Sequence, residues 1–204
     1  DGTLWSWGLN TYGALGNNST TTTSSPIQVG TLNTWSIIST ANSVSWAIKT
    51  DGTLWAWGYN ADGQLGQIDT TNRSSPVQIG TLTSWTNLLS SGKKVDTSGF
   101  ATQSDGTLWA WGYGFGNELG LYHPTSEIAK VMTPLKFTNI SAGGSHTMAV
   151  ASDGSLWGWG LNSSGQLGTG NTTATTSSPV QIGTLKNWSK MLVGWSHTMA
   201  IKTD

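Results

Sequence analysis

The side chains most able to do chemistry in this sequence are its histidines and acids. His146 and His197 each follow a serine. Two other copies of an internal repeat hold Val44 and Ser98 at the same position, so the repeat does not depend on an imidazole there. We therefore expect both histidines to pack or to form hydrogen bonds rather than to catalyse.

The acids divide between a repeated turn and scattered positions. Five of the eight aspartates occupy the first position of a recurring hairpin turn, where Asp serves turn geometry: Asp1, Asp51, Asp105, Asp153 and Asp204. The remaining acids are Asp62, Asp69, Asp96, Glu118 and Glu127. No two of them have a spacing that implies paired acid–base catalysis.

His123 and Glu127 lie four residues apart, but Pro124 interrupts the helix that would bring two metal ligands together. We predict no catalytic residue, no metal site and no cofactor.

Composition excludes further classes of partner. The net charge is −1, and the nine Lys and Arg residues are scattered, so no basic field is present for nucleic acid or for anionic lipid. No apolar run approaches the roughly 20 residues of a membrane-spanning helix. The absence of cysteine excludes disulfides and thiolate metal sites. The chain starts at Asp1 without a Met, and we expect its beginning to have been trimmed or processed.

Thirteen tryptophans could instead suggest a sugar-binding surface. Eight of them belong to a repeated Leu-Trp-x-Trp pattern, and Trp35, Trp85 and Trp188 share a second repeated position. We expect these eleven to pack in the core. Only Trp195 and Trp46 remain as candidates for exposed ligand platforms.

The elements that hold these side chains come from an internal repeat. The sequence Asp-Gly-Thr/Ser-Leu-Trp-x-Trp-Gly starts at Asp1, Asp51, Asp105 and Asp153, at intervals of 50, 54 and 48 residues. Strand-like patterning at this period is typical of β-propeller blades. The sequence therefore predicts an all-β protein with a single propeller region, residues 1–204, made of four-stranded antiparallel blades.

Alternation of side chains places the strands within one unit. In the last complete unit we expect strands over 146–151, 155–160, 179–182 and 188–193, in that order, within one blade. Asp153-Gly154 is predicted to be a two-residue hairpin turn with positive φ. The following loops carry Asn-x-x-Gly-x-Leu-Gly, and positive φ is predicted at Gly13, Gly63, Asn117 and Gly165.

These motifs resemble a known family. Leu-Trp-x-Trp-Gly-x-Asn-x-x-Gly-Gln-Leu-Gly, then Ser-Pro-Val-Gln-Ile, then Gly-x-Ser-His-Thr-Met-Ala, is similar to the regulator of chromosome condensation repeat, over the whole chain. The resemblance implies a ring of about seven blades, of which this chain would form part. It also implies two kinds of role, namely guanine nucleotide exchange on a small GTPase, and inhibition of β-lactamases by protein contact in a secreted bacterial relative.

The ends of the chain are complementary. Residues 3–8 form the second strand of a blade and residues 197–203 the first strand of one. Three arrangements are possible: the chain closes into a four-bladed ring, two copies pair through unpaired strand edges, or the chain is part of a larger ring. We favour the larger ring.

Two departures from the repeat mark a candidate binding surface. Loops after the second and fourth strands should emerge on one face, and the Asp-Gly turns on the other. The first face holds an altered segment at 121–133 and an extension around Lys93. The candidate partner-binding residues are Lys93, Lys94, Tyr122, His123, Glu127, Lys130, Met132 and Trp195.

The sequence favours a non-enzymatic module that binds a protein or builds a structure. Its loops are rich in uncharged Ser, Thr and Asn, which suits an extracellular, cell-surface or virion location. A carbohydrate-binding propeller is the alternative, and nucleotide exchange is a weaker one, because the basic tail used on chromatin is absent.

Overall fold

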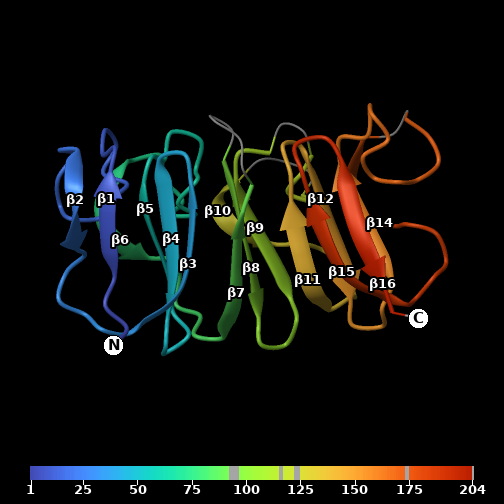
Figure 1. Cartoon of the computed structure of the whole chain (residues 1–204), viewed down its shortest axis with the longest axis horizontal. Helices are drawn as coiled ribbons and strands as arrows, with labels where there is room; N and C mark the ends of the chain where they lie inside the picture. The colour runs from blue at the N-terminus through green and yellow to red at the C-terminus, as the bar shows by residue number, and fades with distance from the viewer. Residues whose placement is uncertain (92–96, 115–116, 122–124, 173–174, 204) are drawn as a thin grey trace.

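The computed structural model describes residues 1–91, 97–114, 117–121, 125–172 and 175–203, and in these residues the regular structure is entirely β (Figure 1). In chain order the strands are β1 (Trp5–Gly8), β2 (Thr23–Gln28), β3 (Trp35–Ala41), β4 (Val44–Lys49), β5 (Leu54–Gly58), β6 (Arg73–Gln78), β7 (Trp85–Ser90), β8 (Ser98–Gln103), β9 (Leu108–Gly112), β10 (Thr125–Lys130), β11 (Phe137–Ala142), β12 (His146–Ala151), β13 (Leu156–Gly160), β14 (Thr176–Gln181), β15 (Trp188–Val193) and β16 (Thr198–Lys202). The prediction of an all-β chain is confirmed.

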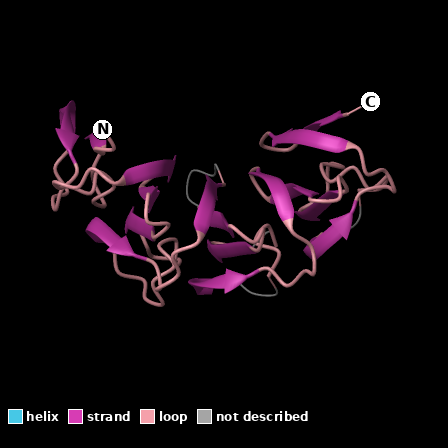
Figure 2. Ribbon diagram, turned by 90° about the horizontal axis from the view of Figure 1, so that it is seen from below, coloured by secondary structure: helices cyan, strands magenta, loops and turns pink. Residues whose placement is uncertain are grey.

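These strands form antiparallel blades that follow one another along an arc. Three sheets are complete, with the orders β3-β4-β5-β6, β7-β8-β9-β10 and β11-β12-β13-β14. A two-stranded sheet lies at each end, β1-β2 at one and β15-β16 at the other. Figure 2 shows the sheets arranged around a curve, with the two chain ends at its opposite tips. This is the propeller architecture that the repeat predicts, present as an open arc.

The boundaries of the blades differ from the prediction. The strand at Trp188–Val193 was expected to be the last strand of the blade that contains His146, but it pairs with β16 and begins the next sheet. The segment between β14 and β15 therefore crosses from one blade to the next instead of forming a hairpin. A hairpin within a blade and a crossing between blades are both short and polar here, so the local sequence does not distinguish them.

Neighbouring blades meet through their first strands. Contacts join β3 to β7, β7 to β11 and β11 to β15. Polar bonds support these contacts: Ser39 Oγ donates to Ser90 Oγ over 3.1 Å, and the Val193 amide donates to Ser141 Oγ over 3.1 Å. The first strand of each blade is thus its inner strand, and the fourth is its outer edge.

The Asp-Gly turn fixes the start of the third strand in each blade. The amide of Thr53 donates to Asp51 Oδ1 over 3.0 Å, and Trp55 Nε1 donates to Thr53 Oγ1 over 2.8 Å. Gly52 alone has positive φ, at +77°, and its amide donates to the carbonyl of Lys49 over 2.9 Å. The turn is therefore longer than the predicted two-residue form, with Asp outside the left-handed region. A Cβ on Gly52 would lie 2.1 Å from the carbonyl oxygen of Thr83, so only glycine fits.

The second Trp of the repeated pair joins one blade to the preceding one. Trp57, Trp111 and Trp159 are 3%, 0% and 0% exposed. Their indole Nε1 atoms donate to backbone carbonyls in the loop of the preceding blade, at Ala14 (2.8 Å), Gln64 (2.9 Å) and Glu118 (2.8 Å). Core packing is confirmed for these three tryptophans.

The first repeat departs from this pattern. Trp7 is 60% exposed because the described residues include no preceding blade to receive its indole. Trp5 is 50% exposed because the β1-β2 sheet has no first strand with an equivalent of Trp35, against which Trp55 packs in the next blade. The prediction of core packing is wrong for this pair. Within the described residues β1 pairs with β2 and β16 pairs with β15, and β1 and β16 do not pair with each other. Among these residues there is also no helix long and apolar enough to cross a membrane.

Candidate functional site

The blades expose two different faces, as the sequence predicts. One face, called here the loop face, carries the long loops after β1, β5, β9 and β13 and the turns between the first two strands of each blade (top of Figure 1). The other, the turn face, carries the Asp-Gly turns and the blade-to-blade connections. Strand alternation forces this separation, since successive strands run in opposite directions.

A buried asparagine organises three of the four long loops, those after β1, β5 and β13. Asn60 is 0% exposed, and its Oδ1 accepts the amide of Leu65 over 2.9 Å while its Nδ2 donates to the carbonyl of Asp69 over 2.8 Å. Asn10 and Asn162 make equivalent bonds. The positive φ predicted in these loops is confirmed at Gly13, Gly63, Asn117 and Gly165. The loop face therefore has a fixed backbone on which exposed side chains are held in place.

Four of the predicted partner-binding residues lie outside the described residues, namely Lys93, Lys94, Tyr122 and His123. Glu127 is exposed on β10, where it forms an isolated antiparallel bridge with Gln67 of the preceding blade's loop. Its assignment to a partner site stays a prediction.

Lys130 and Met132 do not share the loop face. Thr125 pairs with Gly112 at the loop-face end of β10, while Lys130 pairs with Trp109 at the opposite end. Met132, 82% exposed, follows β10 on the turn face. The expectation that the whole of 121–133 departs from the repeat on one face is wrong, because β10 passes through this segment and carries it across the blade.

The two tryptophans predicted as exposed platforms behave differently. Trp195 is 62% exposed in the turn between β15 and β16, on the loop face. Trp46 is 0% exposed, and its Nε1 donates to the carbonyl of Gln64 over 3.1 Å. Its assignment as a platform is wrong, since β4 is a central strand whose residues are all buried.

Sequence reasoning missed Ile68. This residue lies on the loop face, is 72% exposed, and has φ +70°. The equivalent residues in the first and fourth repeats are Asn18, with φ +60°, and Gly170, with φ +82°. A β-branched residue in the left-handed region is a genuine outlier. The signal in the sequence was an Ile at a position where the first and fourth loops hold Asn and Gly.

The loop containing Ile68 is anchored on both sides. The amide of Ile68 donates to the carbonyl of Ser126 on β10 over 2.9 Å, and Ser126 Oγ donates to the carbonyl of Ile68 over 3.2 Å. Next to it, Arg73 and Asp69 form an ion pair of 2.6 Å. Ile68 is thus an apolar side chain held outward by a fixed backbone beside charged groups.

Two titratable groups among the described residues, His146 and Asp153, have strongly lowered pKa values. His146 is 0% exposed, and burial, with a smaller contribution from His197, lowers its pKa from 6.5 to about 4. Its Nε2 lies 3.1 Å from Thr198 Oγ1, which confirms a hydrogen-bonding role. The pKa of the Asp153 carboxyl is lowered by hydrogen bonds from Lys186 and Ser155, as expected for a turn residue. No group of three or more potential metal ligands occurs within the described ranges.

Comparison with known proteins identifies the repeat. The model of the Regulator of chromosome condensation (RCC1) repeat matches residues 1–48, 51–92, 105–150 and 153–201, and a second model of that repeat matches residues 137–166. No curated protein matches the sequence.

Solved structures show the same fold. Human WBSCR16 aligns with a TM-score of 0.79 and 20% identity, over 97% of this chain and 54% of its own. Prp20p from Saccharomyces cerevisiae, studied for its binding to Gsp1p and histones, aligns with a TM-score of 0.80 and 20% identity, over 99% and 52%. Yeast RCC1 (Prp20) with Kap60 bound gives a TM-score of 0.81 at 20% identity, over 100% and 51%.

The chain spans about half the length of these structures, and the identity of 20% carries the likeness of fold alone. The repeat matches cover most of the sequence in four consecutive units. The chain therefore belongs to the regulator of chromosome condensation (RCC1) repeat family.

Proposed function

We propose that this chain is a non-catalytic protein-interaction module whose loop face binds a protein partner. The observation that carries the proposal is Ile68. Its left-handed backbone costs on the order of 1–2 kcal/mol relative to Asn or Gly, and its 72% exposure gives no compensating burial within the chain. Burial of this side chain against an apolar surface of a partner would offset the free-energy cost of the left-handed backbone.

The surroundings of Ile68 suit a protein partner. The ion pair between Arg73 and Asp69 and the exposed carboxylate of Glu127 surround it with charge. An apolar centre with a charged, solvated rim is the usual organisation of a protein interface. Structural relatives also bind proteins, since Prp20p binds Gsp1p and histones and yeast RCC1 binds Kap60. Contacts from Lys93, Lys94, Tyr122 and His123 remain part of this proposal as predictions from the sequence.

The test is the effect of Ile68→Asn on binding. Proteins captured on the immobilised chain are identified by mass spectrometry, and the affinity of the most enriched one is then measured by calorimetry. We expect Ile68→Asn to weaken that affinity at least ~10-fold. The control is Leu82→Ala, which changes an exposed apolar residue on the turn face of the same blade and should leave affinity unchanged. Equal affinities for the parent chain and Ile68→Asn would reject the proposal.

Trp195 supports a second candidate, a glycan-binding surface, because an exposed indole can stack on a sugar ring. The equivalent turn positions hold Asn42 and Gly144, so the platform occurs once among these three turns. A glycan-array signal abolished by Trp195→Ala would favour this candidate. We also propose an extracellular, cell-surface or virion location, supported by the uncharged loops, and detection of the native chain in the cytosolic fraction alone would reject it.

A further inference from the structure

Lys49, the last residue of β4, is a buried lysine whose charge has no contacting partner; it is 7% exposed. Its Nζ lies 3.4 Å from the ring centroid of Trp55 and 4.8 Å from that of Trp35, but these cation–π contacts offer no acceptor to its N–H groups. Among the described residues no carboxylate or carbonyl forms an ion pair or a hydrogen bond with it. Burial lowers the pKa of Lys49, while the carboxylate of Asp51 raises it from beyond ion-pair distance. The ammonium has therefore lost water without gaining an anion in contact.

The repeat shows that the fold does not require a lysine at this position. At the same register in β8 and β12 the residues are Gln103 and Ala151. Gln103 Nε2 donates to Ser84 Oγ over 3.0 Å, and its Oε1 accepts Trp109 Nε1 over 3.1 Å. Ala151 has no polar side-chain atom. Both alternatives are therefore satisfied within their own blades, whereas Lys49 leaves its N–H groups without an acceptor.

The ammonium lies on the wall of a cavity of about 330 Å³ between two blades. One side of this cavity comes from the loop after β1 and the end of β2, with Asn17 and Leu32, and the other from Trp55 of β5 and Pro76 of β6. Ligand pockets in proteins measure roughly 300 to 1,000 Å³, so the space suits a small molecule. The lining combines a cation with amide groups and apolar surface.

Two residues leave this space open. At the next junction the equivalents of Asn17 and Pro76 are Gln67 and Ile128. Gln67 Nε2 donates to the carbonyl of Gln78 over 3.0 Å, and Ile128 packs against the core. Asn17 is shorter by one methylene group, and its side chain bonds within its own loop instead. The larger side chains of the next junction are therefore used by the blades themselves, and the smaller ones here leave room for a ligand.

The junction that holds the cavity is built like the next one. The Nε1 atoms of Trp57 and Trp111 each donate to a loop carbonyl of the preceding blade, over 2.8 and 2.9 Å. The amides of Asn18 and Ile68 each donate to a serine carbonyl of the following blade, over 2.8 and 2.9 Å. Every residue that lines the cavity lies within residues 16–76, so none belongs to the unpaired edges of β1 and β16.

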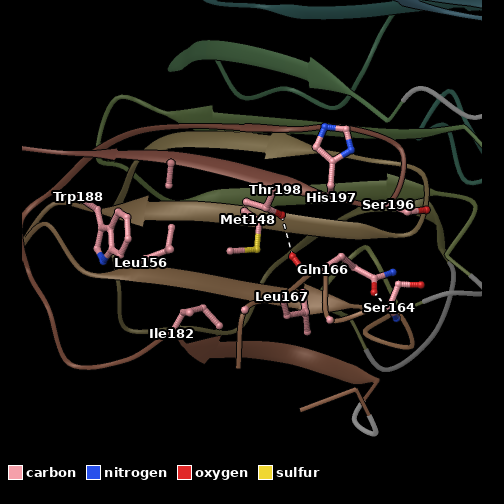
Figure 3. A pocket seen from close by; sticks show the side chains of 13 residues that line it. Met148, Leu156, Ser164, Gln166, Leu167, Ile182, Trp188, Ser196, His197 and Thr198 are labelled. Atoms are coloured by element: carbon pink, nitrogen blue, oxygen red, sulfur yellow. Dashed lines mark hydrogen bonds between the residues drawn. The ribbon is translucent and has the colours of Figure 1, made fainter. Parts of the chain in front are cut away.

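A larger cavity, of about 470 Å³, lies beside β16 and differs in its polar groups (Figure 3). There the hydroxyl of Thr198 donates to the carbonyl of Gln166 over 2.7 Å, and Gln166 Oε1 accepts the amide of Ser164 over 2.9 Å. Among its described lining residues there is no lysine, arginine, aspartate or glutamate. The unpaired cation distinguishes the cavity at Lys49 from this one.

We infer that the cavity at Lys49 binds a small carboxylic acid in its ionised form, with the carboxylate accepting hydrogen bonds from Lys49 Nζ. A carboxylate carries one negative charge, which the one cation in the described lining balances, whereas a phosphate group would bring about 1.5 to 2. The apolar part of the acid would pack on Leu32 and Pro76. The inference goes beyond the loop-face proposal and rests on other residues, so each can fail without the other.

The first test is a titration with benzoate at constant ionic strength, followed by NMR of the indole N–H signals. Benzoate should shift the signals of Trp35 and Trp55 to saturation. Benzamide has the same shape without the charge and should bind at least about 10-fold more weakly. Absence of a saturable shift, or equal affinity for benzoate and benzamide, would overturn the inference.

A carboxylate of this kind is carried by a free small acid or by the C-terminal end of a peptide. N-acetylleucine carries the carboxylate of a peptide end on an apolar side chain, so the same titration distinguishes the two sources. Tighter binding of N-acetylleucine than of benzoate assigns the cavity to peptide ends, and weaker binding assigns it to free acids. Either order supports a carboxylate site.

Two variants separate the charge from the space. Lys49→Met removes the ammonium and should weaken benzoate binding at least about 10-fold. Pro76→Ile copies the residue of the next junction and should weaken binding by filling the cavity, with Lys49 in place. Thermal unfolding verifies that each variant folds, and Pro76→Ile keeps the test decisive if Lys49→Met does not fold.

Lys202→Met is the matched control. Lys202 occupies the same register in the last sheet and lies 4.8 Å over Trp188, outside the cavity, so this variant should bind benzoate like the parent chain. Affinities of Lys49→Met and Pro76→Ile that equal that of the parent would place the bound acid elsewhere and overturn the inference.

Discussion

The strand that carries Leu-Trp-x-Trp-Gly occurs four times, and one copy has different surroundings from the rest. Trp7 in β1 is 60% exposed, while Trp111 in β9 is 0% exposed. The hydrogen bond of Trp111 goes to the carbonyl of Gln64 in the preceding blade. The same residues therefore form the same strand in both places, and the preceding blade decides whether the indole is buried.

This difference shows that contacts with neighbouring blades supply much of the stability of a blade. In each complete blade, the second Trp of the repeated pair donates to a loop carbonyl and packs on a glycine of the preceding blade. The blade's own loop presents an equivalent carbonyl and glycine toward the next blade. Units of this kind depend on nearest neighbours for stability. Where the described residues include no preceding blade, as at Trp7 in β1, the indole is 60% exposed.

The largest expected effect separates interior from terminal tryptophans. Trp111→Ala should lower the free energy of unfolding by about 3–5 kcal/mol, because it leaves a cavity and removes the hydrogen bond to Gln64. Trp7→Ala should change it by less than about 0.5 kcal/mol, because this indole is exposed. Urea unfolding followed by circular dichroism measures both. Equal effects would show that the strand, and not the junction, determines the contribution of the indole.

A second comparison concerns the histidines of the same motif. His146 is buried with a pKa lowered to about 4 by desolvation, and His197 is exposed. As pH falls below 6.5, the unfolded chain takes up a proton at His146 before the folded chain does, so stability should decline between pH 6.5 and about 4, by at most about 3 kcal/mol.

The chain supplies the variant for this test, because Val44 occupies the same position in an earlier repeat. His146→Val should keep the stability at pH 7 and flatten the decline toward pH 4, as measured by urea unfolding across that range. His197→Val is the control and should leave the decline in place. A decline of the same size in His146→Val would assign the pH dependence to other groups.

The smallest expected effect compares two loops on the same face. Ile68→Asn should raise the free energy of unfolding by about 1 kcal/mol, because Asn tolerates the left-handed region. Asn18→Ile at the equivalent position should lower it by a similar amount. Thermal unfolding of the two variants gives the comparison. If neither substitution changes stability, Ile68 carries no strain, and the argument for a partner at that site fails.

Much of the fold could be predicted because the repeat encodes local geometry. The positions of the Asp-Gly turns, though not their length, the positive φ at Gly63 and Asn117, and the separation of the two faces follow from turn chemistry and strand alternation. The blade boundary could not be predicted in the same way. Gly183 and the polar residues after it suit a hairpin as well as a crossing to the next blade, and only the pairing of β15 with β16 distinguishes them.

The candidate site was less predictable, since exposure depends on residues distant in sequence. Trp46 sits outside the repeated Trp positions, which suggested exposure, yet β4 is central and its indole bonds to Gln64. Met132 adjoins an altered loop in sequence, but β10 takes it to the other face. Ile68 draws attention only once its φ of +70° is known.

The most direct test of the central claim, that the preceding blade stabilises the strand carrying Leu-Trp-x-Trp-Gly, compares hydrogen exchange in two copies of that strand. The amides of β9 (Leu108–Gly112), whose Trp111 is buried against the preceding blade, should exchange much more slowly than the amides of β1 (Trp5–Gly8), whose Trp7 is exposed. Equal exchange rates in β1 and β9 would contradict the account.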